Sequence, residues 1–470
     1  MLEQTIIAEL EHVVGEANVL ASPEDLICYS YDGTFAEHRP DVIVLPRTPE
    51  EISKVMRVAY REGIPVVPRG MASGLAAGSV PFSGGITLSL TRMNQILEID
   101  AVNMTAAVEA GVITAYLQEV VEAQGLFYPP DPASIKQCSL GGNVACNAGG
   151  PRCLKYGVTA DYVMGLTVVL ADGRIIHAGG KSIKNVTGYN LVQLFVGSEG
   201  TLGIVAEVLV RLITKPQYVQ TALGIFPRLD DASRAVNSIL ATGVVPATLE
   251  MMDETAIACI EEAMQLGLPL DKEAILILEA DGNDEAAVLR EIEIIANICR
   301  QSGASEVKIA QDEAERADLW RARRSLLPSL ARRAPNQLLE DVTVPRSEIP
   351  EMVQRVKQIS HKYNLPVVIF GHAGDGNLHP TILFDKRDET QWAQAQQAVG
   401  DTFAAAVELG GTLSGEHGVG VLKRDYMESA LGFASLEVQR QIKQGLDPKN
   451  ILNPGKIFPA GPPPIQGRQL

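Results

Sequence analysis

At residues 68–78 the sequence reads Pro-Arg-Gly-Met-Ala-Ser-Gly-Leu-Ala-Ala-Gly, directly after a short apolar strand predicted over 64–68. Glycines lack a Cβ atom, so consecutive backbone N–H groups in such a loop can surround an anion such as a pyrophosphate. The loop matches neither the G-x-G-x-x-G fingerprint nor a P-loop, because it contains no Gly-Lys-Ser/Thr. Alone it is a weak signal, since a glycine-rich turn after a strand is more often only a turn.

Two further glycine-rich loops strengthen this interpretation. Residues 129–134 read Pro-Pro-Asp-Pro-Ala-Ser and lead to Cys-Ser-Leu-Gly-Gly-Asn-Val-Ala-Cys-Asn-Ala-Gly-Gly at 138–150. Residues 197–203, Gly-Ser-Glu-Gly-Thr-Leu-Gly, add a tight turn before a strand. The whole stretch 125–157 shows little periodicity, and an irregular segment of this length inside a compact domain is usually functional. Three such loops without a nicotinamide fingerprint indicate a different dinucleotide.

The segments around these loops alternate between strands and helices. We expect strands over 41–46, 64–68, 86–90, 96–100, 105–110, 163–170 and 203–213, and helices over 2–15, from 48 onward and over 113–124. Thr48 and Glu51 form a capping box around Pro49, which marks the start of the second helix. After Lys215-Pro216, strands over 221–226 and 274–280 and helices over 229–241 and 284–302 predict a small antiparallel sheet backed by helices. This order favours an α/β or α+β protein.

Two short motifs late in the chain gather histidines and a carboxylate. Residues 371–380 read Gly-His-Ala-Gly-Asp-Gly-Asn-Leu-His-Pro after an apolar strand over 367–370, and they contain His372 and His379. Residues 414–420 read Ser-Gly-Glu-His-Gly-Val-Gly and add Glu416 and His417. Two imidazoles and one carboxylate are a standard ligand set for Zn²⁺, Mn²⁺ or Fe²⁺. Hydrogen-bonded structural histidines are the alternative, and the glycines that flank both motifs favour a functional site.

The bulk composition excludes several classes of protein. The chain has 470 residues, of which 46% are hydrophobic and 21% charged, so a large core is available. Its formal net charge of -17 argues against nucleic-acid binding. None of the six cysteines forms a C-x-x-C pair, which argues against a zinc ribbon or an iron–sulfur cluster in this chain. We see neither a signal peptide nor a transmembrane segment, so we expect a cytoplasmic protein.

Over about residues 20–460, these motifs resemble the FAD-linked oxidases of the vanillyl-alcohol oxidase/PCMH superfamily. The resemblance is to the branch of glycolate oxidase flavin subunits, D-lactate dehydrogenases and D-2-hydroxyglutarate dehydrogenases. It implies an α+β fold with a two-subdomain PCMH-type FAD-binding domain over 1–216. An α+β cap domain with an antiparallel sheet and the metal site would follow over 217–425. A C-terminal segment, 426–470, would then return to the FAD domain.

The resemblance also implies which residues hold FAD. Those expected at the pyrophosphate are Arg69, Gly70, Ser73, Gly74 and Gly78. Those expected to line the rest of the cofactor are Pro129, Asp131, Ser134, Ser139, Gly142, Asn143, Asn147, Gly149, Gly150 and Ile204, with Asn453 near the flavin ring. We expect non-covalent FAD, because no histidine lies near residues 69–79. A cysteinyl link through Cys138 or Cys146 is the alternative.

The first loop departs from the pattern of the family, which reads Pro-Arg-Gly-x-Gly-Thr-Gly-Leu-Ser-Gly-Gly. This chain has Ala72, Ser73, Ala76 and Ala77 at the corresponding positions. Alanine is strained at positive φ, so we expect a reshaped or less deeply wrapped loop.

The resemblance assigns roles in the histidine cluster as well. His372, His379 and Glu416 match the metal ligands, Asn377 a polar group of the site, and His417 the catalytic base. Arg323, which shares a helix face with Trp320, matches the arginine that binds the substrate carboxylate. The D-2-hydroxyglutarate branch has a lysine where this chain has Leu339, which favours glycolate or D-lactate as the substrate.

The expected reaction is oxidation of a small D-2-hydroxy acid to the 2-oxo acid. The metal would bind the hydroxyl, Arg323 the carboxylate, and His417 would take the hydroxyl proton while hydride passes to flavin N5. A carbanion pathway, a D-2-hydroxyglutarate-type enzyme and a non-catalytic FAD subunit of an electron-transfer complex are the alternatives. Electrons would pass to a non-nicotinamide acceptor, either an electron-acceptor protein or an iron–sulfur partner subunit, which could hold the chain at a membrane surface. A homodimer stays open.

Overall fold

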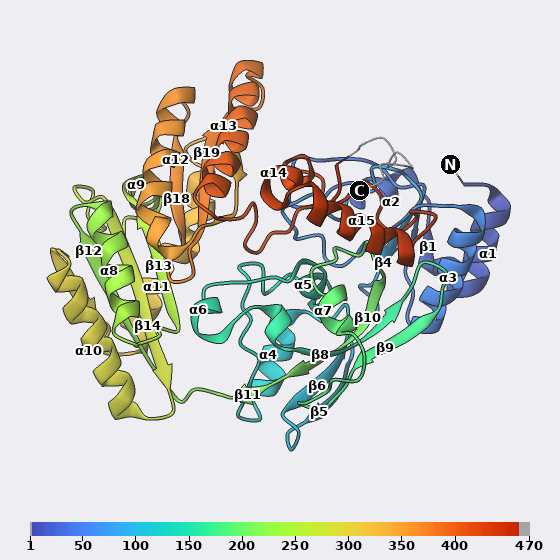
Figure 1. The fold of residues 1–470 in the computed structure, drawn as a ribbon, viewed down its shortest axis with the longest axis horizontal. Coiled ribbons are helices and arrows are strands. Elements are labelled where there is room, and N and C mark those ends of the chain that lie inside the picture. The colour runs from blue at the N-terminus through green and yellow to red at the C-terminus, as the bar shows by residue number, and fades with distance from the viewer. Residues whose placement is uncertain (1, 460–470) are drawn as a thin grey trace.

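Two sheets in the first half of the chain carry the glycine-rich loops (Figure 1). The computed structural model describes residues 2–459. The first sheet has the order β1-β2-β4-β3 (Val19–Leu20, Val42–Val44, Ile86–Ser89, Val66–Arg69) with parallel pairs β2·β4 and β3·β4. The second has the order β5-β6-β10-β8-β9 (Ile96–Asp100, Thr105–Glu109, Ile204–Arg211, Val163–Val169, Ile175–Gly179) and is antiparallel throughout.

The three helices that the sequence predicts in this half are present as α1 (Gln4–Val14), α3 (Pro49–Glu62) and α4 (Thr114–Glu122), whereas α2 (Pro23–Cys28) and α7 (Leu191–Phe195) are not predicted. Helix α3 starts at Thr48, whose hydroxyl accepts a hydrogen bond from Glu51 N at 3.2 Å, and ends at Gly63 with φ 68°. Its apolar stripe is buried against the first sheet. The other elements here are η1 (Glu16–Asn18), β7 (Leu126–Phe127), η2 (Thr159–Asp161) and β11 (Ile213–Thr214).

The stretch 125–157 is more regular than the sequence predicts. It contains helices α5 (Leu140–Cys146) and α6 (Cys153–Tyr156). Ser139 caps α5 by accepting a hydrogen bond from Gly142 N, and Leu140 and Val144 pack into the core. Tertiary packing of these two side chains outweighs the low helix propensity of the paired glycines.

The second half forms one antiparallel sheet with the order β15-β12-β14-β13-β18-β19-β16, and β17 also pairs with β19. The strands are β12 (Tyr218–Phe226), β13 (Thr248–Asp253), β14 (Ala274–Gly282), β15 (Glu306–Ile309), β16 (Asn336–Leu339), β17 (Val342–Thr343), β18 (Val367–His372) and β19 (Asn377–Phe384). The expected antiparallel sheet is thus confirmed, and it extends well beyond the two strands first identified.

Helices cover both faces of this sheet. One face packs against α8 (Leu229–Ala241), α10 (Glu285–Gln301), α12 (Ile349–Tyr363) and α13 (Glu389–Glu408), and the other against α9 (Glu254–Met264) and α11 (Glu313–Leu330). Successive residues of β14 therefore enter different cores: Leu276 belongs to one and Ile277 to the other. This explains why β14 reads as an almost continuous apolar run.

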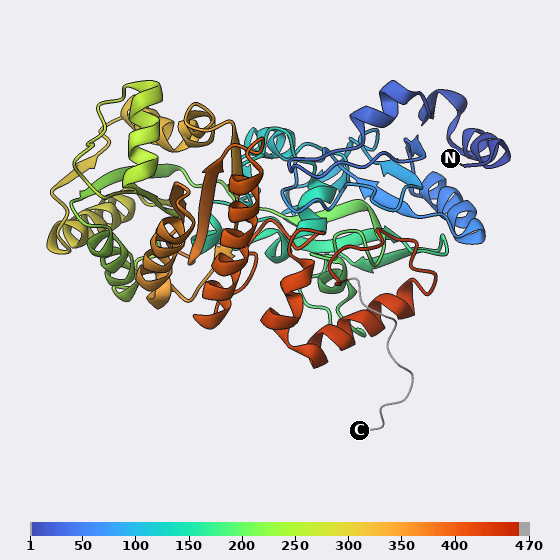
Figure 2. The same ribbon diagram turned by 90° about the horizontal axis from the view of Figure 1, so that it is seen from above.

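The end of the chain returns to the first half (Figure 2). After η4 (Arg424–Tyr426) and α14 (Met427–Leu431), helix α15 (Phe433–Leu446) crosses the glycine-loop half, where Lys443 Nζ donates to Thr201 O at 2.8 Å. Val66 N then donates to Ile451 O at 2.7 Å, and Leu452 is buried in the core around the first sheet. Residues 460–470 of the expected returning segment lie outside the described residues.

We call residues 2–214 together with 427–459 the first lobe, residues 218–408 the second lobe, and residues 409–426 the return loop. Lys155 of the first lobe pairs with Asp281 of the second, Nζ to Oδ1 at 2.5 Å, and Tyr156 Oη donates to the same carboxylate at 2.7 Å. No helix among the described residues is long and apolar enough to cross a bilayer.

Glu340 lies between β16 and β17, and its ionisation allows a test of how the stability of the protein depends on pH. Its burial raises the pKa from the usual 4.5 to about 7. Between these pH values the folded protein keeps a proton that the unfolded chain loses, so the free energy of unfolding falls as pH rises. Glu340→Gln removes this ionisation and should raise the free energy of unfolding at pH 8, by at most about 3 kcal/mol, and by much less at pH 4.5.

Urea unfolding of the FAD-loaded protein at the two pH values measures the difference. The control is Glu293→Gln on the exposed side of α10, which should leave the pH dependence unchanged. Equal pH dependence in wild type and Glu340→Gln would contradict the assignment.

Candidate active site at the junction of the lobes

A cavity of about 710 Å³ lies between the three glycine-rich loops and reaches the return loop. Its volume is within the range of about 300–1,000 Å³ that is typical of small-molecule sites. The predicted residues in its wall are Arg69, Gly70, Ser73, Gly74, Gly78, Ser134, Ser139, Gly142, Asn143, Gly149 and Ile204. Glu416 and His417 line the same cavity. The glycine-rich loops and two residues of the histidine–carboxylate cluster therefore line the same cavity.

Charge inside the cavity fits an anionic cofactor. Arg69 is 7% exposed, its guanidinium lies 5.3 Å from the Tyr29 ring, and its Nη1 is buried without a hydrogen-bond partner among the described residues. A buried cation of this kind calls for a bound anion. At Gly74 an added Cβ would meet no atom within 4 Å, so the loop leaves open space there. These features fit the pyrophosphate of FAD.

The departures in the first loop have a definite backbone consequence. Ala72 and Ala77, at the two positions where the family carries glycine, both adopt left-handed φ, 54° and 59°. This geometry costs an alanine about 1–2 kcal/mol, and the expected reshaping of the loop stays a prediction. Gly70 is needed for a different reason, because an added Cβ would lie 2.4 Å from Ser139 Oγ of the second loop.

Five residues that we expected to line the cofactor lie outside the wall of the cavity: Pro129, Asp131, Asn147, Gly150 and Asn453. Pro129 is buried next to the second loop. Asp131, Asn147 and the Nδ2 group of Asn453 are engaged by the protein, whereas Asn453 Oδ1 is buried without a hydrogen-bond partner among the described residues. Asp131 pairs with Arg152, Asn147 Oδ1 accepts from Ala160 N, and Asn453 Nδ2 donates to Gly78 O and Glu199 O. At Gly150, φ is 152° and an added Cβ would meet Asp131 O at 2.4 Å.

Strand register brings the second half of the site together. Glu250 of β13, His372 of β18, Asn377 of β19 and Thr343 of β17 are successive cross-strand partners. In the neighbouring row, Phe370 pairs with His379. Partners in such rows lie on the same face of the sheet with Cβ atoms about 5 Å apart. The register therefore brings residues that are distant in the sequence together in one cluster.

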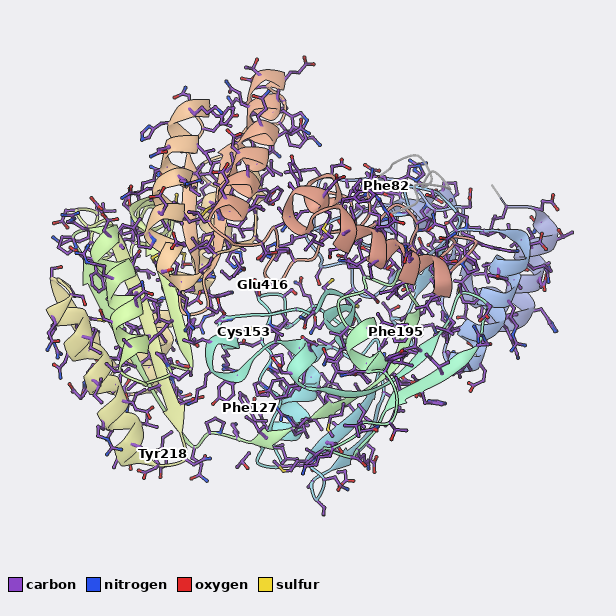
Figure 3. All side chains as sticks on the ribbon, in the orientation of Figure 1. Phe82, Phe127, Cys153, Phe195, Tyr218 and Glu416 are labelled. Carbon is purple, nitrogen blue, oxygen red and sulfur yellow. The ribbon has the colours of Figure 1, made fainter. Side chains whose placement is uncertain are left out.

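His372, His379 and Glu416 form a triangle of possible metal ligands. Their distances are 3.5 Å between the two Nε2 atoms, 3.3 Å from His379 Nε2 to Glu416 Oε1 and 3.6 Å from His372 Nε2 to the same oxygen. A tetrahedral ion held at about 2.1 Å requires ligands about 3.4 Å apart, so the three residues fit a divalent metal. In Figure 3, Glu416 lies where the lobes meet, close to Cys153.

Asp341 orders the peptide that carries Glu416 and His417. Its buried Oδ2 accepts hydrogen bonds from the backbone N atoms of both residues, at 3.0 and 2.9 Å, and from Ser414 Oγ at 2.5 Å. Its Oδ1 accepts from Asn377 Nδ2 at 2.6 Å. Asp341, His379 and His417 also form a second possible ligand group. His417 therefore has the geometry of either a base or a ligand.

Glu199 joins the third glycine-rich loop to the return loop. Its carboxylate accepts hydrogen bonds from Val419 N at 2.7 Å and Gly420 N at 2.8 Å. The Glu199 backbone is left-handed with φ 51°, which turns the side chain out of the tight turn toward these amides. The lobe with the glycine-rich loops thus holds the peptide that carries Glu416 and His417.

Arg323 faces the sheet beside the cluster. Its Nε donates to Glu250 Oε2 at 2.7 Å, and its guanidinium lies 4.8 Å from the centre of the Phe370 ring. Trp320 faces the same sheet, donating from Nε1 to Glu279 at 2.9 Å, as the shared helix face predicts. Arg321 and Arg324 are exposed.

The protein environment shifts the pKa values of the groups in this cluster in different directions. Burial lowers the pKa of His417 to about 4, which leaves a neutral imidazole at pH 7. Burial would also lower the pKa of His372, but Glu250 and Glu416 raise it well above its usual value. The two carboxylates thus favour a positive charge on the His372 ring itself. Burial raises the pKa of Cys146 to about 12, so this thiol in the cavity wall is protonated and a poor nucleophile.

Sequence reasoning missed Glu250, Asp341 and Glu199 as site residues. A signal for Glu250 was present, since a lone carboxylate inside the apolar strand Thr-Leu-Glu-Met-Met requires a buried partner. Glu199 lies in the third glycine-rich loop and Asp341 lies two residues after Leu339, but their partners are backbone amides of the return loop. Every residue except proline has a backbone amide, so the sequence does not show which residue supplies such a partner.

Comparison with known proteins agrees with this architecture. Residues 215–457 match the family described as FAD linked oxidases, C-terminal domain, and residues 40–179 match the FAD binding domain. The chain is 46% identical over 459 residues to "Glycolate oxidase subunit GlcD" of Bacillus subtilis (strain 168), covering 97% of each chain. It is 37% identical over 432 residues to "D-lactate dehydrogenase" of Anaerostipes hadrus, covering 90% of each.

Solved structures show the same fold at low sequence identity. The 4-ethylphenol oxidase of Gulosibacter chungangensis matches with a TM-score of 0.79 at 22% identity and 97% coverage of both chains. p-Cresol methylhydroxylase matches with a TM-score of 0.79 at 18% identity and 96% coverage of both chains. With the cavity, its glycine-rich loops and the two family matches, these findings establish that the chain belongs to the FAD-linked oxidases and is an FAD-binding oxidoreductase.

Proposed function

We propose that this protein oxidises a small D-2-hydroxy acid, glycolate or D-lactate, to the 2-oxo acid. The observation that carries the proposal is that Glu416 and His417 line the same cavity as the glycine-rich loops. A substrate in this space would touch both the cofactor and the histidine–carboxylate cluster. The names of the relatives, a glycolate oxidase subunit and a D-lactate dehydrogenase, support this choice of substrate.

Each group of residues would have a separate role in the reaction, according to its chemistry. The FAD, held non-covalently by the three loops, would supply a two-electron acceptor. A divalent ion at His372, His379 and Glu416 would supply a Lewis acid that lowers the pKa of the substrate hydroxyl. Arg323 binds the carboxylate, and its two terminal nitrogens make no hydrogen bond with the described residues. His417 is neutral at pH 7 and accepts the hydroxyl proton.

The site gives less support to a substrate with a second carboxylate. Leu339 occupies the place of the lysine found in the D-2-hydroxyglutarate branch. Lys423 is near, but it is 2% exposed and donates to Asp341 O and Leu413 O. It is therefore already engaged by the protein. A monocarboxylate fits the charges of the cluster better.

We propose a partner protein or subunit as the electron acceptor, because one relative is named as a subunit. The segment 181–190 offers a surface for it: Ile183, Val186 and Tyr189 are 91%, 98% and 95% exposed. Neighbouring apolar side chains with this exposure are typical of contact surfaces. Such a partner could also hold the protein at a membrane surface.

Flavin bleaching is the direct test of the substrate class. Under anaerobic conditions D-lactate and glycolate should reduce the flavin, whereas L-lactate should leave it oxidised. Turnover with a dye acceptor and little turnover with O₂ would support a dehydrogenase that uses a partner. A flavin that no 2-hydroxy acid reduces would contradict the proposed function.

Arg323→Ala tests the binding of the substrate carboxylate. Loss of a buried charge-assisted pair costs about 2–5 kcal/mol, so kcat/KM for D-lactate should fall by about 10²-fold or more. Arg324→Ala, which removes an exposed arginine on the same helix, is the control and should retain full activity. An unchanged kcat/KM in Arg323→Ala would assign the carboxylate to another cation.

The roles of the two histidines can be separated by metal analysis. His379→Ala should lose activity together with the metal, whereas His417→Ala should keep metal and FAD and lose turnover. Two imidazoles and Glu416 suffice to hold the ion, which leaves His417 as the base. If His417→Ala loses its metal in step with His379→Ala, His417 is a ligand and the base lies elsewhere.

A further inference from the structure

Glu250 lies between two groups to which the proposed function gives separate tasks. It is 0% exposed, and each of its carboxylate oxygens has one partner. Oε1 bonds to His372 Nδ1, and Oε2 accepts from Arg323 Nε at 2.7 Å. Arg323 is a permanent cation that donates to Oε2, so it holds this group as a carboxylate. A fully buried charge with two opposite partners fixes both of them.

On one side, Glu250 orients the guanidinium. Its bond to Nε and the contact of the guanidinium with the Phe370 ring define the plane of the group. The free Nη1 and Nη2 atoms then point along one edge, which is the edge that binds a carboxylate in two parallel hydrogen bonds. Without Glu250, rotation about the bonds of the long Arg323 side chain would let the Nη1–Nη2 edge point in many directions.

On the other side, Glu250 orients His372. The Glu250 carboxylate occupies Nδ1, which leaves Nε2, the atom that faces His379 and Glu416, as the position for a cation. Carboxylates in this position fix the tautomer of a ligating histidine and increase its basicity. The cross-strand pairing of Glu250 with His372 makes the contact part of the sheet.

We propose that Glu250 is a positioning residue that couples the metal site to the binding of the substrate carboxylate. This inference rests on the proposed function, because it assumes the metal at His372 and the substrate carboxylate at Arg323. One carboxylate serves both groups, so its neutralisation should weaken both binding events, although Glu250 itself touches neither the metal nor the substrate.

Glu250→Gln tests the proposal, because it keeps the shape of the side chain and removes its charge. The FAD-loaded enzyme is freed of metal with a chelator, and Zn²⁺ and Mn²⁺ affinities are measured by competition with a chromophoric chelator. The metal Kd should rise by about 10–100-fold. At saturating metal, the KM for D-lactate should still rise by about tenfold, because Arg323 is no longer oriented.

Glu279→Gln is the matched control. Glu279 lies on the adjacent strand β14 and bonds to Trp320 of the same helix and to Thr221, but to no group of the cluster. It should leave metal Kd and KM within about twofold of wild type. Equal effects in both variants would overturn the proposal, since they would reflect packing of α11 on the sheet. A Glu250→Gln enzyme with normal metal Kd, or with normal KM at saturating metal, would also overturn it.

If Glu250→Gln does not fold, the variant Glu250→Asp tests the proposal instead. This variant keeps the charge but is one methylene shorter, so it cannot reach both partners and should raise metal Kd or KM by about fivefold or more. Wild-type values for both would overturn the coupling. A wild-type enzyme that binds neither ion would instead contradict the metal part of the proposed function, and this inference with it.

Discussion

The register of the antiparallel pairs β13·β18 and β18·β19 is the constraint on which the site depends. It sets Glu250 opposite His372, His372 opposite Asn377, and Phe370 opposite His379. Because side chains alternate between faces, a slip of one residue would send His372 to the opposite face and separate it from its partners. Both faces of this sheet are buried under helices, so the register is strongly determined by packing. The apolar core thus fixes the geometry of the polar cluster.

The cluster places an unusual amount of charge away from water, and its arrangement explains how this is tolerated. Glu250, Asp341 and Glu416 are each balanced by cations, imidazoles or backbone amides. Unpaired, each of these carboxylates would carry a large desolvation penalty. Within the triangle of possible metal ligands, the Glu416 carboxylate faces the imidazoles of His372 and His379, and a bound cation would compensate its charge further. The same pairing that satisfies the charges also fixes the directions of the functional atoms.

The contacts of Glu199 hold the first lobe against the cluster. Its carboxylate accepts hydrogen bonds from Val419 N and Gly420 N of the return loop. Within the first lobe, Lys443 and the peptide at Ile451 attach the end of the chain to residues 66 and 201. The histidine–carboxylate cluster is therefore set over the cavity from both sides. The position of the cluster relative to the glycine-rich loops is thus fixed by contacts within the protein.

The sequence by itself determined the α+β class, the capped start of α3, the alternation of strands and helices, and the motifs with His372, His379, Glu416 and His417. These features are local, because turn residues, caps and apolar periodicity act within a few positions of the chain. It also marked Ala72, Ser73, Ala76 and Ala77 as departures from the family pattern, and only the structure shows that Ala72 and Ala77 adopt positive φ. Only the tertiary structure decided that Glu250 joins Arg323 to His372, that Asp341 holds the Glu416–His417 peptide, and that α5 forms within a glycine-rich stretch. Asp131, Asn147 and Asn453 support the loops from outside the cavity wall for the same reason. Their partners are distant in sequence, and a buried polar group takes whichever partner the packing of the core places within reach.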